Sequence, residues 1–526
     1  MPHKPGQNGL GRRVSFRLFG VAAFLLTVAC LGEAPANAQA APAPAQGGQA
    51  SVPQSNVKAF GARGDARAAA GCSVAARAQT VTCARASFTP ADVGKRFILP
   101  GAGAAGADLV TTVSAQNGAT QISLGAAAAA AVSGKEATYG TDDTAAIQAA
   151  VGAAQAAGSG GTVFFPEGRY LTSGLKSTSP SVQFRGQGWD RTTLSNFSAT
   201  ATTVDVYSAL SAYESAGGVY DMAFTPAVTR EKTANEIKVF VGLPNFTVAG
   251  CLFKNVGRAL KLGDAAAITS GYWVRDCRYI NCWQFLKMVR VIDAFVRDVV
   301  GDLARLDNPV GIHLDGGCEG NTFTSLGLVN AAAYDIYQSN QAAAAGGGTD
   351  LLVAADEFKG TDAAHNFFVN SFFDSAADGA VFNDGRNFSF TNCWFNGTYR
   401  YGAYVGARTD GYAFVSCKFR YAGDTGLVLA GTRHTVRACY AVSNGTRGRG
   451  VAQAGFQVAA TNFVFTGNFA FNGWGGFSGQ AYGLVLEPAA DNFIVKDNVL
   501  TGNAAQGLLN NAGPPGRTKI VADNLQ

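Results

Sequence analysis

Four side chains with cationic or acid–base chemistry recur at nearly constant spacing in the middle of the chain. They are Lys261, Lys287, His313 and Tyr337, separated by 26, 26 and 24 residues. Each is a central residue of a short strand-like segment, between apolar neighbours except that Gln338 follows Tyr337. In a strand whose apolar residues face the core, such a central residue faces out. We therefore expect the four side chains to form one outward column on neighbouring strands.

The column predicts chemistry on an anionic substrate. Cations can neutralise a substrate carboxylate and so acidify the proton beside it. His313 can then accept that proton, as can one of the two lysines, because each disfavours the charged form of the other. Tyr337 can act as the acid. This combination fits β-elimination from a uronic-acid polymer.

Other polar residues near the column are predicted to bind substrate. These are Asp264, Arg290, Asp315 and Tyr404. Asp264 and Asp315 can also be read as the two carboxylates of a hydrolase, for which inversion needs a separation of up to about 9.5 Å. A Ca²⁺ site stays open, although two acids are few for this ion. No other metal site or cofactor is expected.

One acidic pair, Asp356 and Glu357, lies in an apparent insertion at 341–364. It can overhang the column or belong to a solvated loop, and we favour the loop.

The elements that would position this column repeat every 22 to 30 residues from about residue 246 onward. Each repeat carries a small or amide residue at the same place, between two apolar segments. The members of this predicted internal ladder are Cys251, Cys277, Cys393, Cys417, Cys439, Asn468 and Asn498. This period is typical of a three-sided β-solenoid, and about ten or more coils are visible. A buried ladder explains these cysteines better than a metal site does.

The segments before these repeats carry a family resemblance. Val57–Asp65 is followed, after an interruption, by a helix start at Gly140–Val151, which Thr141 or Asp142 can cap. Strand-like segments Thr162–Leu171 and Val182–Trp189 come next. Together they resemble the N-terminal cap of the pectate-lyase-like superfamily, which includes rhamnogalacturonase-like and epimerase-like proteins.

The resemblance implies an all-β fold: a single-stranded right-handed parallel β-helix with a short N-terminal capping helix. It also implies that the sheet bearing the column forms the floor of a saccharide groove. We expect an acidic polysaccharide as the partner and lyase activity as the function. The alternatives are a hydrolase, transferase or epimerase, and a saccharide-binding or adhesin-like protein without catalysis, because fold does not fix function.

The predicted domain order follows from these patterns. Residues 1–38 form a signal peptide, 39–55 a flexible leader and 56–526 the β-helix domain. Within that domain, 66–139 is an inserted small β-subdomain, 140–195 holds the cap helix and first coils, and 246–512 holds the regular coils. Cys72 and Cys83 bracket a hairpin-like stretch of the insertion, and we expect them to form a disulfide.

The N-terminus predicts export to the periplasm or the extracellular space. Cationic residues up to Arg17 precede the apolar run Leu18–Leu31, and Ala36-Asn-Ala38 fits a signal-peptidase site. Removing this segment lowers the formal net charge from +5 to +2, so nucleic-acid binding is not expected. No later apolar run is long enough to cross a membrane. We expect a monomer or a small homo-oligomer.

Overall fold

The computed structural model describes residues 54–526 except for 158–159, 209–216, 242–244, 304–308, 330–347, 448–452 and 474–478. The predicted signal peptide and most of the predicted leader lie outside the described residues, as does Tyr337. Across the described ranges no helix is long and apolar enough to span a membrane.

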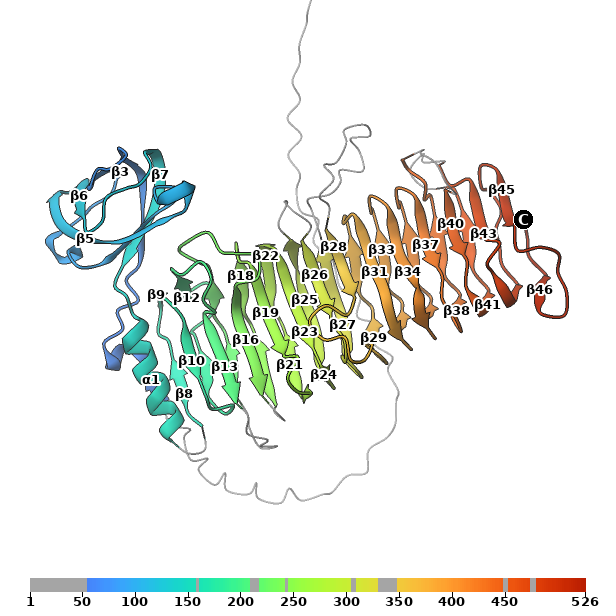
Figure 1. Ribbon diagram of the computed structural model, residues 1–526, viewed down its shortest axis with the longest axis horizontal. Helices are drawn as coiled ribbons and strands as arrows, with labels where there is room; N and C mark the ends of the chain where they lie inside the picture. The colour runs from blue at the N-terminus through green and yellow to red at the C-terminus, as the bar shows by residue number, and fades with distance from the viewer. Residues whose placement is uncertain are drawn as a thin grey trace, which may run out of the picture. The chain divides into compact units, whose positions relative to one another are not determined.

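The described chain is a parallel β-solenoid, which confirms the predicted fold class. One face is a 13-stranded parallel sheet, in which each strand pairs with the equivalent strand of the next coil (Figure 1). Its strands, in order, are β10 (Leu175–Ser177), β13 (Val204–Ser208), β16 (Asn235–Val241), β19 (Arg258–Gly263), β23 (Gln284–Val289), β26 (Val310–Leu314), β28 (Thr349–Val353), β31 (Asp378–Arg386), β34 (Tyr401–Asp410), β37 (Thr425–Leu429), β40 (Ala454–Val458), β43 (Tyr482–Leu486) and β45 (Gln506–Asn510). The other strands of the coils belong to a 25-stranded sheet.

A single residue with positive φ turns the chain between two strands of the 25-stranded sheet. In one coil, β21 (Tyr272–Arg275) and β22 (Arg278–Cys282) are separated by Asp276, with φ of 56°, and Cys277. Short polar residues tolerate this left-handed conformation, which makes a tight corner with few residues. The corner directs Cys277 inward, where its side chain is fully buried.

The residues at this corner form the predicted ladder. The cysteines of the ladder are buried free thiols. Further along, the side-chain oxygen of Asn468 accepts a hydrogen bond from the backbone of Cys439 at 2.9 Å, and Asn498 does the same for Asn468 at 2.9 Å. The ladder therefore satisfies backbone groups inside the solenoid from one coil to the next.

The capping helix is α1 (Thr144–Ala156), and it packs against β1 (Gln54–Asn56), β8 (Thr162–Phe164) and β10. It is the one α-helix among the described residues. Its N-cap position is Asp143, one residue after the predicted Asp142, but the side chain that accepts from the first helical N–H, that of Thr144 at 3.1 Å, is Asp142. The Asp143 carboxylate accepts instead from the backbone of Arg63 and Gly64, which ties the cap to the preceding loop.

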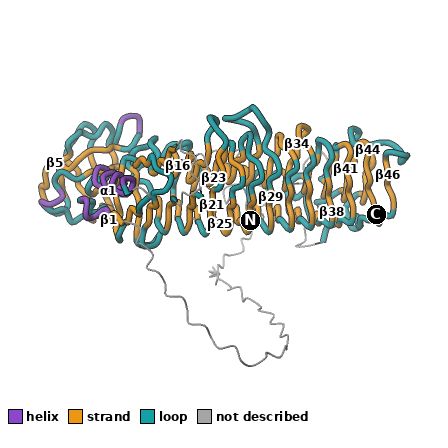
Figure 2. The backbone as a smooth tube through the Cα atoms, turned by 90° about the horizontal axis from the view of Figure 1, so that it is seen from below, coloured by secondary structure: helices purple, strands orange, loops and turns teal. Residues whose placement is uncertain are grey.

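Residues between β1 and α1 form a closed six-stranded antiparallel barrel. Its strands are β2 (Arg67–Val74), β3 (Thr80–Arg85), β4 (Arg96–Leu99), β5 (Leu109–Gly118), β6 (Gln121–Leu124) and β7 (Val132–Gly140). Cys72 and Cys83 form a disulfide between β2 and β3. The barrel has a hydrophobic core of its own, distinct from the continuous core of the coils. Figure 2 shows β16, β23 and β34 following one another along the row of coils.

Candidate functional site

The predicted outward column lies on the 13-stranded sheet. Lys261 on β19 pairs in register with Lys287 on β23, which pairs with His313 on β26. Adjacent members are thus one strand spacing apart, about 4.8 Å. The 26-residue period gave this register correctly, because each coil there contains the same number of residues.

The fourth position of the column is Leu352, not Tyr337. Leu352 lies on β28 and pairs with His313 on one side and Val381 on the other. Our assignment of Tyr337 to this position of the column was therefore wrong. The extent of the insertion at 341–364 was also wrong, because Thr349–Val353 is a strand of the sheet. Tyr337 itself falls outside the described residues.

The segment that follows β28 covers the column. We call residues 354–362 the strap. Its Glu357 carboxylate bridges the two lysines, with Oε2 2.7 Å from Lys261 Nζ and Oε1 3.0 Å from Lys287 Nζ. Asp356 Oδ2 is also 3.0 Å from Lys287 Nζ. The acidic pair thus overhangs the column, and our preference for a solvated loop was wrong.

Asp315 holds the strap in this position. Its carboxylate accepts hydrogen bonds from the backbone of Asp356 and Glu357, both at 2.8 Å, and of Phe358 at 3.2 Å. Lys287 Nζ is 3.3 Å from the same group. Burial would raise the pKa of Asp315, but these backbone donors hold it below its usual value. Asp315 is therefore an ionised anchor for the strap.

Lys287 is a buried cation. It is only 3% exposed, and burial alone would lower its pKa. The carboxylates of Glu357 and Asp356 outweigh burial and raise the pKa above the usual value. Lys287 therefore stays charged, which contradicts our expectation that it can serve as the base.

His313 has the properties of a neutral base. It is 6% exposed, and burial together with the charge of Lys287 lowers its pKa. Nε2 is 3.0 Å from the carbonyl oxygen of Ala354, which can only accept. The proton of the neutral ring therefore lies on Nε2, and Nδ1 carries the lone pair.

The remaining predicted residues lie at different distances from the strap. The Arg290 guanidinium stacks on the ring of Phe358, 4.3 Å from its centroid. Asp264 is 4.0 Å from Lys238 Nζ, on the rung before Lys261. Tyr404 shares the column but lies three rungs beyond His313, about 14 Å away. Arg290 thus belongs to the covered site, and Tyr404 extends the same sheet surface.

Sequence reasoning missed Asp384, which lies beside Ala355 near the start of the strap. Its Oδ2 is 3.5 Å from the backbone nitrogen of Ala355 and 3.3 Å from the guanidinium of Arg408. Burial raises its pKa, with a further contribution from Asp362. A register shift between Phe382 and Asp384 takes this residue out of the regular alternation, so no periodic signal marks it.

No group of three or more His, Cys, Asp or Glu side chains in the described ranges is arranged to hold a metal ion. The Asp315 carboxylate instead forms an ion pair with Lys287 and accepts hydrogen bonds from the backbone of the strap.

Family models match two parts of the chain. Residues 133–259 match rhamnogalacturonase A/epimerase, pectate lyase-like, and residues 359–524 match the right-handed β-helix region. The chain therefore contains a pectate lyase-like segment and, further along, a right-handed β-helix region. No curated protein matches its sequence.

Three solved structures similar to this β-helix protein have low sequence identity to it. The A-module of the Azotobacter vinelandii mannuronan C-5 epimerase AlgE6 is 16% identical, with a TM-score of 0.37 over 73% of this chain and 95% of that one. DFA-IIIase from Arthrobacter chlorophenolicus is 10% identical, with a TM-score of 0.46 over 73% and 94%. Pre-mature gene product 12 of bacteriophage phi29 is 9% identical, with a TM-score of 0.52 over 69% and 51%. The phi29 similarity supports the fold alone.

Proposed function

We propose that this β-helix protein acts on an acidic polysaccharide and cleaves it by β-elimination. The observation that carries the proposal is that Lys261 and Lys287 together hold one carboxylate beside the neutral His313. A uronate unit needs such a pair of cations at its carboxylate and a neutral base near C5.

In the proposed reaction, the substrate carboxylate replaces Glu357 between the two lysines. Their charges stabilise the negative charge that develops as C5 loses its proton to Nδ1 of His313. The C4–O4 bond then breaks, its electron pair leaves with O4, and a C4=C5 double bond remains. An acid protonates O4, and Tyr337 stays our prediction for that role.

The strap must move for this reaction to occur. It neutralises the lysines and leaves His313 almost fully buried, so a polymer cannot reach the base while the strap is in place. Asp356 is 68% exposed, and the outer side of the strap faces solvent. Displacement of a loop by a charged ligand is a common way to admit substrate.

Hydrolysis is the second candidate, and Asp384 favours it. A glycosidase needs one carboxyl group whose pKa is raised so that it can act as the acid. Asp384 meets that requirement, and the strap acids Asp356 and Asp362 lie on the neighbouring segment. Glycan binding without catalysis is the third possibility.

The deciding experiment is incubation with polygalacturonate, alginate and a panel of neutral glycans. Elimination gives an unsaturated uronate with ultraviolet absorbance, whereas hydrolysis gives reducing ends alone. We expect H313A and K287A to abolish the absorbance signal and H365A to keep it, because His365 is exposed beside Glu319, outside the column. Reducing ends without absorbance would indicate hydrolysis instead of elimination. No product from any glycan of the panel would favour binding without catalysis.

Export is part of the proposal. A Cys72–Cys83 disulfide is typical of an oxidising compartment. The mass of the mature protein tests it, since cleavage after Ala38 predicts an N-terminus at Gln39.

A further inference from the structure

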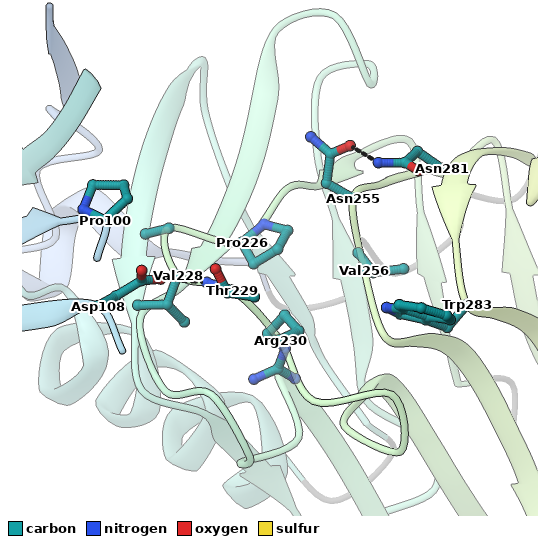
Figure 3. Close-up of a pocket in the computed structure, with 11 residues that line it drawn as sticks. Pro100, Asp108, Pro226, Val228, Thr229, Arg230, Asn255, Val256, Asn281 and Trp283 are labelled. Carbon is teal, nitrogen blue, oxygen red and sulfur yellow. Dashed lines mark hydrogen bonds between the residues drawn. The ribbon is translucent and has the colours of Figure 1, made fainter. Parts of the chain in front are cut away.

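A hollow lies where a loop of the solenoid meets the barrel, away from the strap. It has a volume of about 440 Å³ and is lined by Pro226, Val228, Asn255, Val256, Asn281 and Trp283, among others (Figure 3). Its walls combine six apolar and five polar or charged residues, so they can offer both apolar contact and hydrogen-bonding groups to a small organic ligand.

The backbone around this pocket is fixed by hydrogen bonds. Trp283 donates from its backbone nitrogen to Val256 at 3.2 Å and accepts from Val310 at 2.9 Å. On the opposite wall, the backbone nitrogen of Thr229 donates to the carboxylate of Asp108 on the barrel at 2.6 Å. The pocket therefore exists before any ligand arrives, which lowers the entropic cost of binding.

Three polar groups remain available in the pocket. Asn281 Nδ2 donates to Asn255 Oδ1 at 2.8 Å, so Asn255 keeps its amide donors and Asn281 keeps its amide oxygen. Figure 3 shows the indole nitrogen of Trp283 at the end of the ring that faces the other lining residues. Within the described part of the chain, this N–H has no hydrogen-bond partner. The pocket thus offers donors and an acceptor side by side, as the hydroxyl groups of a sugar require.

The charged side chains of the pocket already have partners within the protein. Arg230 Nε is 3.0 Å from the buried carboxylate of Glu236, and its guanidinium also donates to the carbonyl of Asn235 at 2.9 Å. The two oxygens of Asp108 accept from the backbone of Gly101 and Thr229. Lys232 lies over the Trp283 ring, 4.2 Å from its centroid, outside the lining set. Arg230 is thus already paired and Asp108 would repel an anion, so the lining favours an uncharged ligand over a uronate, in contrast to the lysine site.

We infer that this pocket binds one uncharged sugar unit of a glycan. Its position is separate from the column, because Trp283 precedes Lys287 by four residues, about 13 Å along an extended strand. The inference rests on the proposed function only for the choice of a glycan as ligand. Its test measures binding rather than turnover, so the two proposals fail independently.

The test is calorimetric binding of neutral tetrasaccharides of glucose, mannose, galactose, xylose and rhamnose to the full chain. We expect at least one to bind, and W283A to weaken that binding at least about tenfold through the lost contacts. W283F keeps an aromatic ring but removes the N–H together with part of the indole surface, and should weaken it about three- to tenfold. N255G removes the amide while keeping the backbone unstrained, since Asn255 has φ of 57°, and should also weaken binding.

Two variants serve as matched controls. W273A removes a half-exposed tryptophan that stacks on Phe295 in the other sheet, 4.4 Å between ring centroids, and should bind normally. K287A should bind normally as well, even if it abolishes turnover. Failure of every neutral probe, binding that W283A and N255G leave unchanged, or W283-dependent binding of uronate oligomers alone would each overturn the inference.

Discussion

His313 determines the pH dependence expected of the lyase. Its neutral form is the base, and burial together with Lys287 lowers its pKa below the ordinary value of 6.5. The neutral form therefore persists below pH 6.5, and kcat/KM should fall only as the pH drops through the lowered value. Replacing Lys287 by Met removes the neighbouring charge, so the pKa of His313, followed by NMR titration of its ring, should rise. An unchanged His313 pKa in that variant would contradict this assignment.

The buried Asp350 should make the stability of the protein depend on pH. Its carboxyl is fully buried, neither oxygen has a partner among the described residues, and burial raises its pKa well above the usual value. The folded state keeps the proton that the unfolded chain releases above about pH 4, so stability falls as the pH rises. D350N should remove this loss and raise the free energy of unfolding at pH 7 by about 1 kcal/mol or more.

Urea unfolding at pH 4 and pH 7 measures the effect, and Asp92 supplies the control. Asp92 accepts from Lys95 and Thr89, which hold its pKa below the usual value despite burial, so D92N should destabilise the protein at pH 7. If D350N and D92N changed stability in the same direction, the environment assigned to Asp350 would be wrong.

At the scale of elements, substitutions in the strap should change KM for the substrate. Glu357 competes with a substrate carboxylate for Lys261 and Lys287, so E357Q should lower KM for a uronate polymer by about tenfold, the equivalent of a lost charge-assisted contact. D497N, which removes an exposed acid beside Lys496 in a distant coil, should leave KM unchanged. A higher KM for E357Q would mean that the strap helps to bind substrate rather than to exclude it.

The same elements show what could be predicted from the sequence. The ladder and the alternation of apolar residues fix the phase of each coil, so the register of Lys261, Lys287 and His313 followed directly. Periodicity fails where coil length changes, which is why Tyr337 was placed where Leu352 lies. The strap could not be predicted, because Glu357 meets Lys261 across 96 residues of sequence and no local pattern reports that contact.

At the scale of the whole molecule, the barrel is an insertion whose two ends meet. The backbone nitrogen of Thr141 donates to Asp65 at 2.8 Å, and a Cβ added at Gly140 would lie 2.6 Å from the Cα of Ala66. The solenoid therefore needs no residue of the barrel to continue its chain path. The barrel contributes Ile98, which packs on Leu171, Phe197 and Val228, and it supplies one wall of the proposed sugar pocket.

Deleting residues 67–139 and joining Ala66 to Gly140 separates these roles. We expect the β-sheet circular dichroism of the coils and turnover of the acidic polymer to persist, because the lysine–histidine column and the strap lie entirely on β19 to β28 and the segment after it. The melting temperature should fall, since Leu171 and Phe197 lose their apolar cover and Asp142 loses its ion pair with Arg96. Neutral-sugar binding should fall as well, because deleting Asp108 removes the hydrogen bond that holds the backbone of Thr229. An unfolded deletion protein would instead make the barrel a folding element of the solenoid, and unchanged sugar binding would remove it from the pocket.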